Sequence, residues 1–239
     1  MTPVLAAVVT GLAGLVAGVV GVYVKDRVDH RREAAALVRR YRDPLLHAAY
    51  ELQSRVWNIV DRGFLTAYGG PGGYGELSTL WVFGQYFGWA ERLRRDVQFL
   101  DLGTQRANRE LAKRLAAIRF ALASDTQVDD PRFMVFRAEQ RAIGEVMIGA
   151  DGTVLGFAAF SRAYGGDPVF AGWFAKLAHD LEAVRHEERP EHYRLRLLQG
   201  RLMDLVDLLD PQRVRFGSER DRLPLPPGRS ELMPPDAVA

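Results

Sequence analysis

The feature that most constrains this chain is an uncharged apolar segment near its N-terminus, residues 3–24, PVLAAVVTGLAGLVAGVVGVYV. At a helical rise of about 1.5 Å per residue, such a segment extends about 33 Å. That length is enough to cross a hydrocarbon core of about 30 Å. Tyr23 falls at the end of the segment, where a membrane interface favours an amphipathic ring. We therefore expect a transmembrane anchor at 3–24.

Two other interpretations of residues 3–24 are open, a cleaved signal peptide and a buried core helix of a soluble protein. A signal peptide has a positively charged region before its apolar run and a small-residue cleavage site after it. Neither pattern is clear in this sequence, since no basic side chain precedes the run. The anchor is the favoured interpretation.

Residues 25–42 follow the apolar segment and contain many basic side chains. We predict that they form a juxtamembrane helix that continues the anchor. Because positive charge stays on the cytoplasmic side, we expect a single-pass protein of the cell membrane with its C-terminal domain in the cytoplasm. Such side chains attract anionic lipid headgroups by about 1 kcal/mol each. The predicted headgroup contacts are Lys25, Arg27, Arg31 and Arg32.

Small residues recur along one side of the predicted anchor at spacings of three and four. They are Ala7, Gly11, Gly14, Gly18 and Gly21. Small residues let helix backbones approach closely in lipid, where packing drives association. The pattern predicts self-association or a partner helix, although glycine is also simply common in membrane helices.

Composition limits the function classes. The chain is 48% hydrophobic and 26% charged, so it can bury a core, and its net charge of only +2 weighs against a nucleic-acid partner. It has no cysteine, which excludes disulfides, thiol nucleophiles and zinc–thiolate sites.

Helical periodicity predicts an all-α domain of about six helices, bundle-like, over 43–211. Asp43 and Pro44 suit a helix start, Gly63 an end, and Ser78 another start. The expected helices lie at about 43–62, 78–100, 104–123, 137–148, 167–188 and 190–210, with a short helix at 157–163.

Residues 132–164 have two interpretations. Apolar spacing favours a helix up to Ile148, followed by a turn at Asp151 and Gly152. An Asp-Gly pair between apolar runs is also typical of a two-stranded hairpin, which is the alternative.

Residues 212–239 contain five prolines and few large apolar side chains. Such a composition gives little surface to bury. We expect a disordered tail.

Four segments resemble a family of uncharacterised helical bacterial proteins that often carry an N-terminal membrane segment. These segments are RDPLLHAAYELQSRVWNI, STLWVFGQYFGWAERLRRDVQFLDLG, FRAEQRAIGEVMIG and LQGRLMDLVDLLDP. The resemblance covers about 42–211 and implies one helical domain. No known activity comes with it.

Polar residues gather in two places of the predicted domain. One cluster includes Arg137, Glu139, Arg141 and Glu145, and the other includes Arg55. If both face one cleft, they can bind an anion through charge-assisted hydrogen bonds. The favoured alternative is an interhelical polar network with surface ion pairs.

His179, Glu182 and His186 fall at i, i+3 and i+7 and are the best candidate metal ligands. A carboxylate-bridged site in a helical bundle needs Glu-x-x-His on two helices, a pattern that is missing here. A solvated charged face is the favoured interpretation, and we predict no metal or cofactor.

We therefore expect a non-enzymatic scaffold, adaptor or regulatory protein at the inner face of the membrane. The alternative is a membrane effector whose glycine-lined helices assemble on a signal. A third possibility is an enzyme or ligand-binding protein with a polar pocket between helices.

Overall fold

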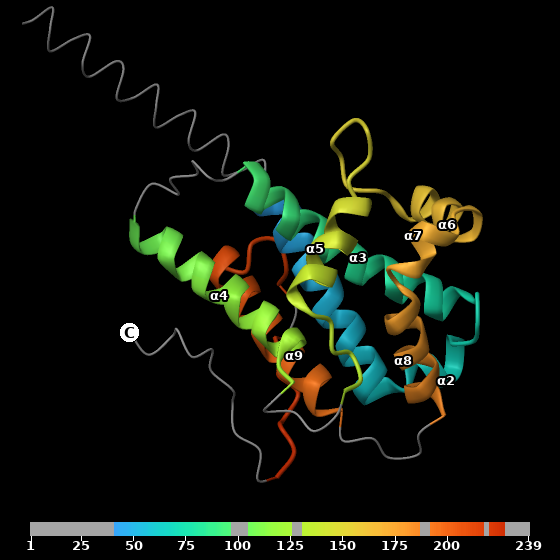
Figure 1. Ribbon diagram of the computed structural model, residues 1–239. Coiled ribbons are helices and arrows are strands. Elements are labelled where there is room, and N and C mark those ends of the chain that lie inside the picture. The colour runs from blue at the N-terminus through green and yellow to red at the C-terminus, as the bar shows by residue number, and fades with distance from the viewer. Residues whose placement is uncertain (1–40, 97–104, 126–130, 187–191, 218–219, 228–239) are drawn as a thin grey trace, which may run out of the picture.

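The computed structural model describes residues 41–96, 105–125, 131–186, 192–217 and 220–227, which form an all-helical arrangement (Figure 1). The helix over 41–62 is followed by α2 (Phe64–Tyr68), α3 (Tyr74–Asp96), α4 (Gln105–Ala123), α5 (Arg137–Val146), α6 (Phe157–Gly166), α7 (Pro168–Gly172), α8 (Ala175–Arg185) and α9 (Tyr193–Leu209). Within these residues the single β feature is an antiparallel bridge between Ile148 and Val154. The prediction of an all-α fold is confirmed.

The segment at 3–24 and the basic residues after it lie outside the described residues. In the described part of the chain, no helix combines the length and the apolar character that crossing a membrane requires.

The helix over 41–62 runs through the middle of the domain, blue in Figure 1. Its apolar side chains recur every three or four residues, so they share one face and become buried together. The buried stripe is Leu45, Ala49, Leu52, Val56 and Ile59, as predicted. Gly63 ends this helix with a φ of 63°, a left-handed conformation that glycine adopts at little cost.

Two features around α3 differ from the sequence-based expectation. The one-turn helix α2 was not predicted. Helix α3 begins at Tyr74 rather than at Ser78, because Gly70 and Gly72 adopt positive φ and turn the chain earlier. Ser78 is therefore not a cap but a buried residue inside the helix.

Helix α3 packs on α5 and on the loop that follows α5. Gly84 and Gly88 lie one turn apart on α3 and leave room for Met147 and Val154. A Cβ atom at Gly88 would lie 2.7 Å from Cγ1 of Val154. Glycine is thus what lets the loop approach the α3 backbone.

The loop after α5 contains the predicted turn. The Asp151 carboxylate accepts hydrogen bonds from the Thr153 amide and hydroxyl, and Gly152 adopts a φ of 73°. The indole of Trp81 donates to the carbonyl of Leu155 at 3.0 Å and holds the loop on α3. Helix α5 ends two residues before the predicted Ile148, and the alternative hairpin is reduced to the single bridge.

The helix predicted over 167–188 begins as expected but is interrupted. The Asp167 carboxylate caps α7 by accepting from the amides of Val169 and Phe170. The break between α7 and α8 turns Phe174 inward, where its ring packs 5.4 Å from Phe170 and 5.2 Å from Phe160. A ring cluster of this kind adds stability beyond its buried area.

Arg194 on α9 joins three parts of the domain. Its side chain is fully buried, and its guanidinium donates hydrogen bonds to the carbonyls of Ala121, Leu122, Ser124 and Arg132. The first three carbonyls belong to the C-terminal end of α4, where carbonyls lack helical partners and favour positive charge. Arg194 thereby fixes the end of α4 against α9.

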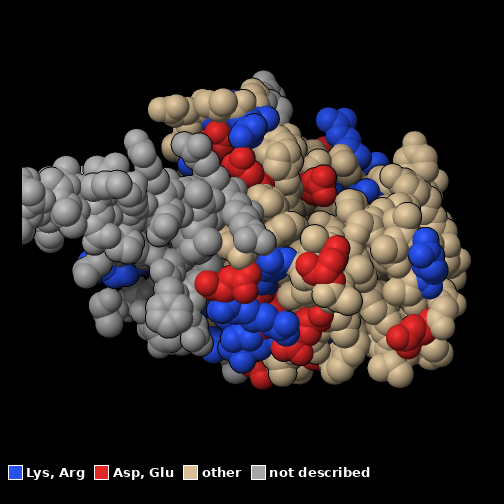
Figure 2. All heavy atoms as spheres, turned by 90° about the horizontal axis from the view of Figure 1, so that it is seen from above, with Lys and Arg blue, Asp and Glu red and all other residues tan. Residues whose placement is uncertain are grey.

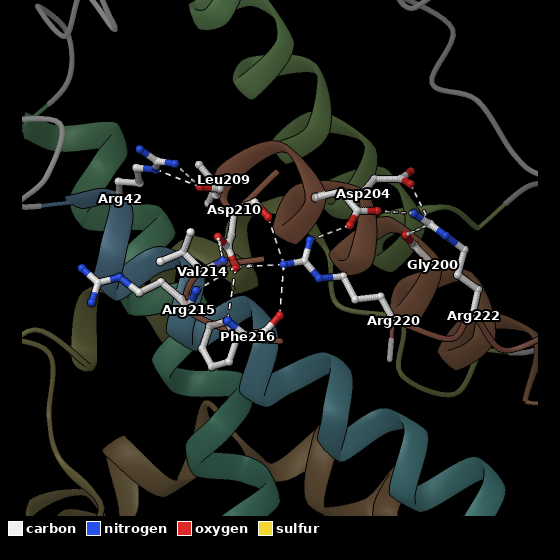
Figure 3. A network of polar contacts seen from close by, with 11 residues as sticks. Arg42, Gly200, Asp204, Leu209, Asp210, Val214, Arg215, Phe216, Arg220 and Arg222 are labelled. Carbon is white, nitrogen blue, oxygen red and sulfur yellow. Dashed lines mark hydrogen bonds and ion pairs between the residues drawn. The ribbon is translucent and has the colours of Figure 1, made fainter. Parts of the chain in front are cut away.

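Residues 210–217 and 220–227 differ from the expectation of a disordered tail, because they pack on α9 (Figure 3). The Asp210 carboxylate accepts from the amides of Val214, Arg215 and Phe216 and forms an ion pair with Arg220 at 2.8 Å. Three converging N–H groups and a buried guanidinium order this turn.

Apolar and polar contacts then hold the segment against two helices. The Phe216 ring stacks on Tyr50 at 3.8 Å. Arg222 pairs with Asp204 of α9 (Figure 3) and also with Asp207, and Leu223 is buried. Composition alone misses these contacts because each depends on a distant partner.

We predict that Gly144→Ala lowers the free energy of unfolding by about 1–3 kcal/mol, because overpacking strains the α3–α5 contact. A Cβ atom at Gly144 would lie 2.6 Å from the Phe87 carbonyl oxygen. Urea unfolding measures the change. Gly200→Ala is the control, since a Cβ at Gly200 meets no atom within 4 Å, and it should raise stability by about 0.5–1 kcal/mol. Equal effects of the two changes would contradict the close packing.

Candidate functional site

A cavity of about 580 Å³ opens between α3, α4 and α5. Its apolar wall consists of Tyr86, Phe87, Ala90, Leu115 and Ala138, and its polar wall of Glu91, Arg94, Arg119, Arg137, Gln140 and Arg141. We call this cavity the arginine pocket. Its volume and its apolar lining with a few polar groups are typical of small-molecule sites.

Three arginines come together at the pocket. Arg137 and Arg141 lie one turn apart on α5, so they share a helix face, and Arg119 comes from α4. All three residues are exposed at the mouth. In the described part of the chain none of their guanidinium groups forms an ion pair or hydrogen bond.

The pKa of Arg119 is affected by burial and by the two neighbouring arginines. Although part of the residue is exposed, protein atoms around its guanidinium remove water and lower its pKa, and the charges of Arg137 and Arg141 lower it further. The neighbouring Tyr86 acts in the opposite direction. Arginine stays protonated in proteins, so three positive charges meet here.

Tyr86 forms the buried side of the pocket and is only 2% exposed. Burial raises the pKa of its hydroxyl, which therefore stays protonated and can donate a hydrogen bond. No hydrogen bond of this hydroxyl is found within the described residues. A buried hydroxyl at a cavity wall is a ready donor for a ligand.

Glu91 is the one carboxylate in the pocket lining, and it is already neutralised. Arg94 donates to both of its oxygens at 2.7 and 2.6 Å, and Arg95 donates at 2.8 Å. Burial raises the pKa of Glu91, but these hydrogen bonds lower it more, and the net shift is downward. Glu91 is therefore ionised, with two positive partners of its own.

The structure separates the residues that the sequence predicts as one ligand site. Arg137 and Arg141 line the pocket. Glu139 instead accepts the Phe136 amide at 2.8 Å and so stabilises the start of α5. Glu145 pairs with Arg95 at 3.2 Å.

Arg55 lies away from the pocket lining, between the helix over 41–62 and α3. Its Nη1 donates to Ser78 at 2.8 Å and to Thr79 at 3.0 Å, and its guanidinium lies 4.1 Å from the Phe64 ring centre. Burial lowers its pKa. For Arg55 the contacts match the alternative interpretation, an interhelical polar network.

Arg119 and Tyr86 line the pocket but are not marked as site residues by the sequence. Arg119 is flanked by apolar residues, and Tyr86 lies in an aromatic run that is typical of a core. Their shared role appears only when α3 and α4 come together. A lone arginine in an otherwise apolar helical stretch is the one local signal that could have directed attention to Arg119.

The candidate metal ligands take part in local contacts. Glu182 pairs with Arg185 at 2.7 Å and contacts His186 at 2.9 Å. Across the described ranges, no group of three or more His, Cys, Asp or Glu side chains is placed to hold a metal ion.

Comparisons with models of protein families, with curated proteins and with solved structures find no match for this chain. The resemblance to helical bacterial proteins therefore stays a prediction. Functional inference depends on the pocket geometry.

The described lining of the arginine pocket is rich in guanidinium groups, and its one carboxylate is held by two arginines. A general base or nucleophile needs a group that is free to accept a proton or attack a substrate. Guanidinium groups bind and orient anions without such chemistry.

We predict that Glu91→Gln lowers the free energy of unfolding by about 1–2 kcal/mol at neutral pH, because charge-assisted hydrogen bonds are lost. The pKa of Glu91 is lower in the folded state, so its contribution is present above its ordinary value of 4.5 and disappears as the pH falls through the folded value. Urea unfolding across this range measures it. The gap between the two proteins should close in acid, whereas a gap independent of pH would refute the assignment. Glu110→Gln is the control, because Glu110 is a half-buried glutamate whose pairing with Arg114 is long, at 3.9 Å.

Proposed function

We propose that this chain is a regulatory binding protein and that its arginine pocket binds an anionic ligand. The observation that carries the proposal is the convergence of Arg119, Arg137 and Arg141 on one cavity without a protein anion to balance them. Three guanidinium groups repel one another, and an anion placed between them relieves that repulsion. Guanidinium also matches carboxylate and phosphate in shape, so each group can form two parallel hydrogen bonds.

A ligand in the pocket would also link helices, which is what a regulatory site requires. Arg119 belongs to α4 and Arg137 to α5, and the two helices already meet where the Gln140 amide donates to the Arg119 carbonyl at 3.2 Å. An anion that bridges them would favour conformations in which the two helices are close. A ligand shifts a conformational equilibrium when it contacts one conformation better than another.

We further propose that the protein acts at the inner face of a membrane, as a scaffold or adaptor as well as a ligand receptor. The support for anchoring is the apolar segment at 3–24 with its following basic residues. The support for a protein partner is the surface of α6 and α7, at the upper right of Figure 1, where Val169 is 75% and Trp173 is 42% exposed.

Charge is sparse on that surface. Between Phe157 and Trp173 the chain has only Arg162 and Asp167 as charged residues. Seen from above, charged side chains gather over one part of the molecule, while the side toward α6 and α7 carries few (Figure 2). Exposed apolar side chains in a charge-poor area favour protein contact.

We predict that the double variant Arg137→Gln/Arg141→Gln binds 2-naphthalenesulfonate about tenfold more weakly or worse, because two charge-assisted contacts are lost. Titration calorimetry on the full chain in nonionic detergent measures the affinity. Stability should change little, since both side chains are exposed and unpaired in the described part of the chain. Arg62→Gln, an exposed arginine outside the pocket lining, is the matched control. Unchanged affinity in the double variant would refute the binding site.

We predict that the full chain sediments with membranes and resists extraction by alkaline carbonate, because the segment at 3–24 is long enough to span. Deletion of 3–24 should move the protein to the soluble fraction. Neutralising Lys25 and Arg27 should leave the anchor in place, which separates insertion from surface attraction. The double variant Gly14→Leu/Gly18→Leu tests helix association separately. If it stays in the membrane but no longer forms cross-linked oligomers, the segment at 3–24 is an assembling helix.

A further inference from the structure

We infer that the ligand of the arginine pocket carries a phosphate monoester dianion on an aromatic or flat apolar body. This inference rests on the proposed function, because it names the chemical class of the anion that the pocket binds. Charge, shape and the buried hydroxyl each support it.

The charge of the pocket matches a dianion better than a monoanion. Glu91 is balanced within the protein by Arg94 and Arg95, so it does not offset the other arginines. Three positive charges then remain, from Arg119, Arg137 and Arg141. A carboxylate or sulfonate would balance one of them, whereas a phosphate monoester carries a charge near −2 at neutral pH and offers three acceptor oxygens. Those oxygens can accept from several guanidinium groups at once.

The size and walls of the pocket require more than an inorganic ion. A volume of about 580 Å³ fits a small organic molecule. Phe87 and Leu115 are buried apolar side chains in its lining, with Tyr86 beside them. Apolar surface of this kind gains by covering a ring or a short aliphatic body.

The Tyr86 hydroxyl adds a neutral hydrogen-bond donor to a pocket that has arginines on one wall and apolar side chains on the other. Tyr86 of α3 and Arg119 of α4 both line the pocket. The Tyr86 hydroxyl can therefore donate to an ester or phosphate oxygen while its ring contacts the apolar body. A pocket with an arginine rim, a phenolic donor and an apolar wall matches the three parts of an aryl phosphate.

Phosphate monoesters can come from two sources, a soluble metabolite or a lipid such as phosphatidate. The proposed membrane anchor would place the pocket within reach of both. Both sources offer the same dianionic phosphate ester, and displacement by phosphatidate distinguishes them.

The test is titration calorimetry of the full chain in nonionic detergent with 2-naphthyl phosphate and 2-naphthalenesulfonate, which share a ring and differ in charge. At about pH 7.5 the phosphate should bind at least about tenfold more tightly. Near pH 5 the phosphate is mostly a monoanion, since its second pKa is about 6, and the preference should largely disappear. The charged and titratable groups of the pocket are Tyr86, Glu91, Arg94, Arg119, Arg137 and Arg141. No histidine is among them, so the ligand carries this titration.

Two variants connect the preference to the pocket. Arg119→Gln removes one of three charges and should reduce the preference for the dianion by several-fold more than it reduces sulfonate binding. Tyr86→Phe removes only a hydroxyl, and it should weaken naphthyl phosphate by about three- to tenfold through the lost hydrogen bond. Thermal unfolding of both variants verifies that they fold, and Arg62→Gln is again the control.

The outcomes separate the inference from the function on which it rests. Equal affinity for the two probes, lost in Arg137→Gln/Arg141→Gln, would overturn the phosphate monoester and leave anion binding in place. No pocket-dependent binding of either probe would overturn both. Where naphthyl phosphate binds as expected, displacement by micelles containing phosphatidate, but not phosphatidylglycerol, assigns the lipid source. Absence of displacement assigns a soluble phosphate ester.

Discussion

The helical domain depends on a buried positive charge that main-chain carbonyls solvate. Arg194 donates to carbonyls at the end of α4 and to that of Arg132, and so replaces the water that those groups would otherwise bind. Beside it the Val135 amide donates to the Leu122 carbonyl at 2.9 Å. The end of α4 and the residues before α5 are therefore held together. These contacts fix where α5 starts, and Arg137 is its first residue. A structural arginine thus sets the position of the proposed ligand-binding arginines.

The contact between α3 and α5, which forms another wall of the pocket, depends on a glycine, Gly144. Gly144 brings α5 so close to α3 that a single added carbon would meet the Phe87 carbonyl at 2.6 Å. That approach places the α5 arginines over Tyr86, which belongs to α3. The two devices have different physical origins, since one is a set of charge-assisted hydrogen bonds and the other is close packing. Together they hold three helices around a cavity that packing would otherwise fill.

The sequence predicts those features that depend only on residues within one helix. The stripe from Leu45 to Ile59 follows from helical periodicity, and the cap at Asp167 follows from the preference of aspartate for helix starts. Arg137 and Arg141 belong to one predicted polar cluster, which α5 carries. The break before α8 and the packing of 210–227 depend on distant partners, such as Phe160 for Phe174 and Tyr50 for Phe216. The same limit applies to the site. Its α5 half was predictable, whereas Arg119 and Tyr86 join it only through the tertiary fold, and Arg55 belongs to another contact.

Arg119, Arg137 and Arg141 stand out because all three line one cavity. The side chains of Arg162 and Arg213 also lack a protein partner among the described residues, but neither lines this cavity. Basic and acidic residues are nearly balanced, 32 against 30, so an overall excess of positive charge does not explain three uncompensated groups in one place. Near the pocket, Arg94 and Arg95 share Glu91, and on the other side of the domain Arg220 and Arg222 are matched by aspartates of α9 and the residue after it. Neighbouring like charges repel one another, and no acidic side chain of the described residues pairs with these three. A pocket that keeps three positive charges together, beside a buried hydroxyl and an apolar wall, has the composition that a bound organic anion would complete.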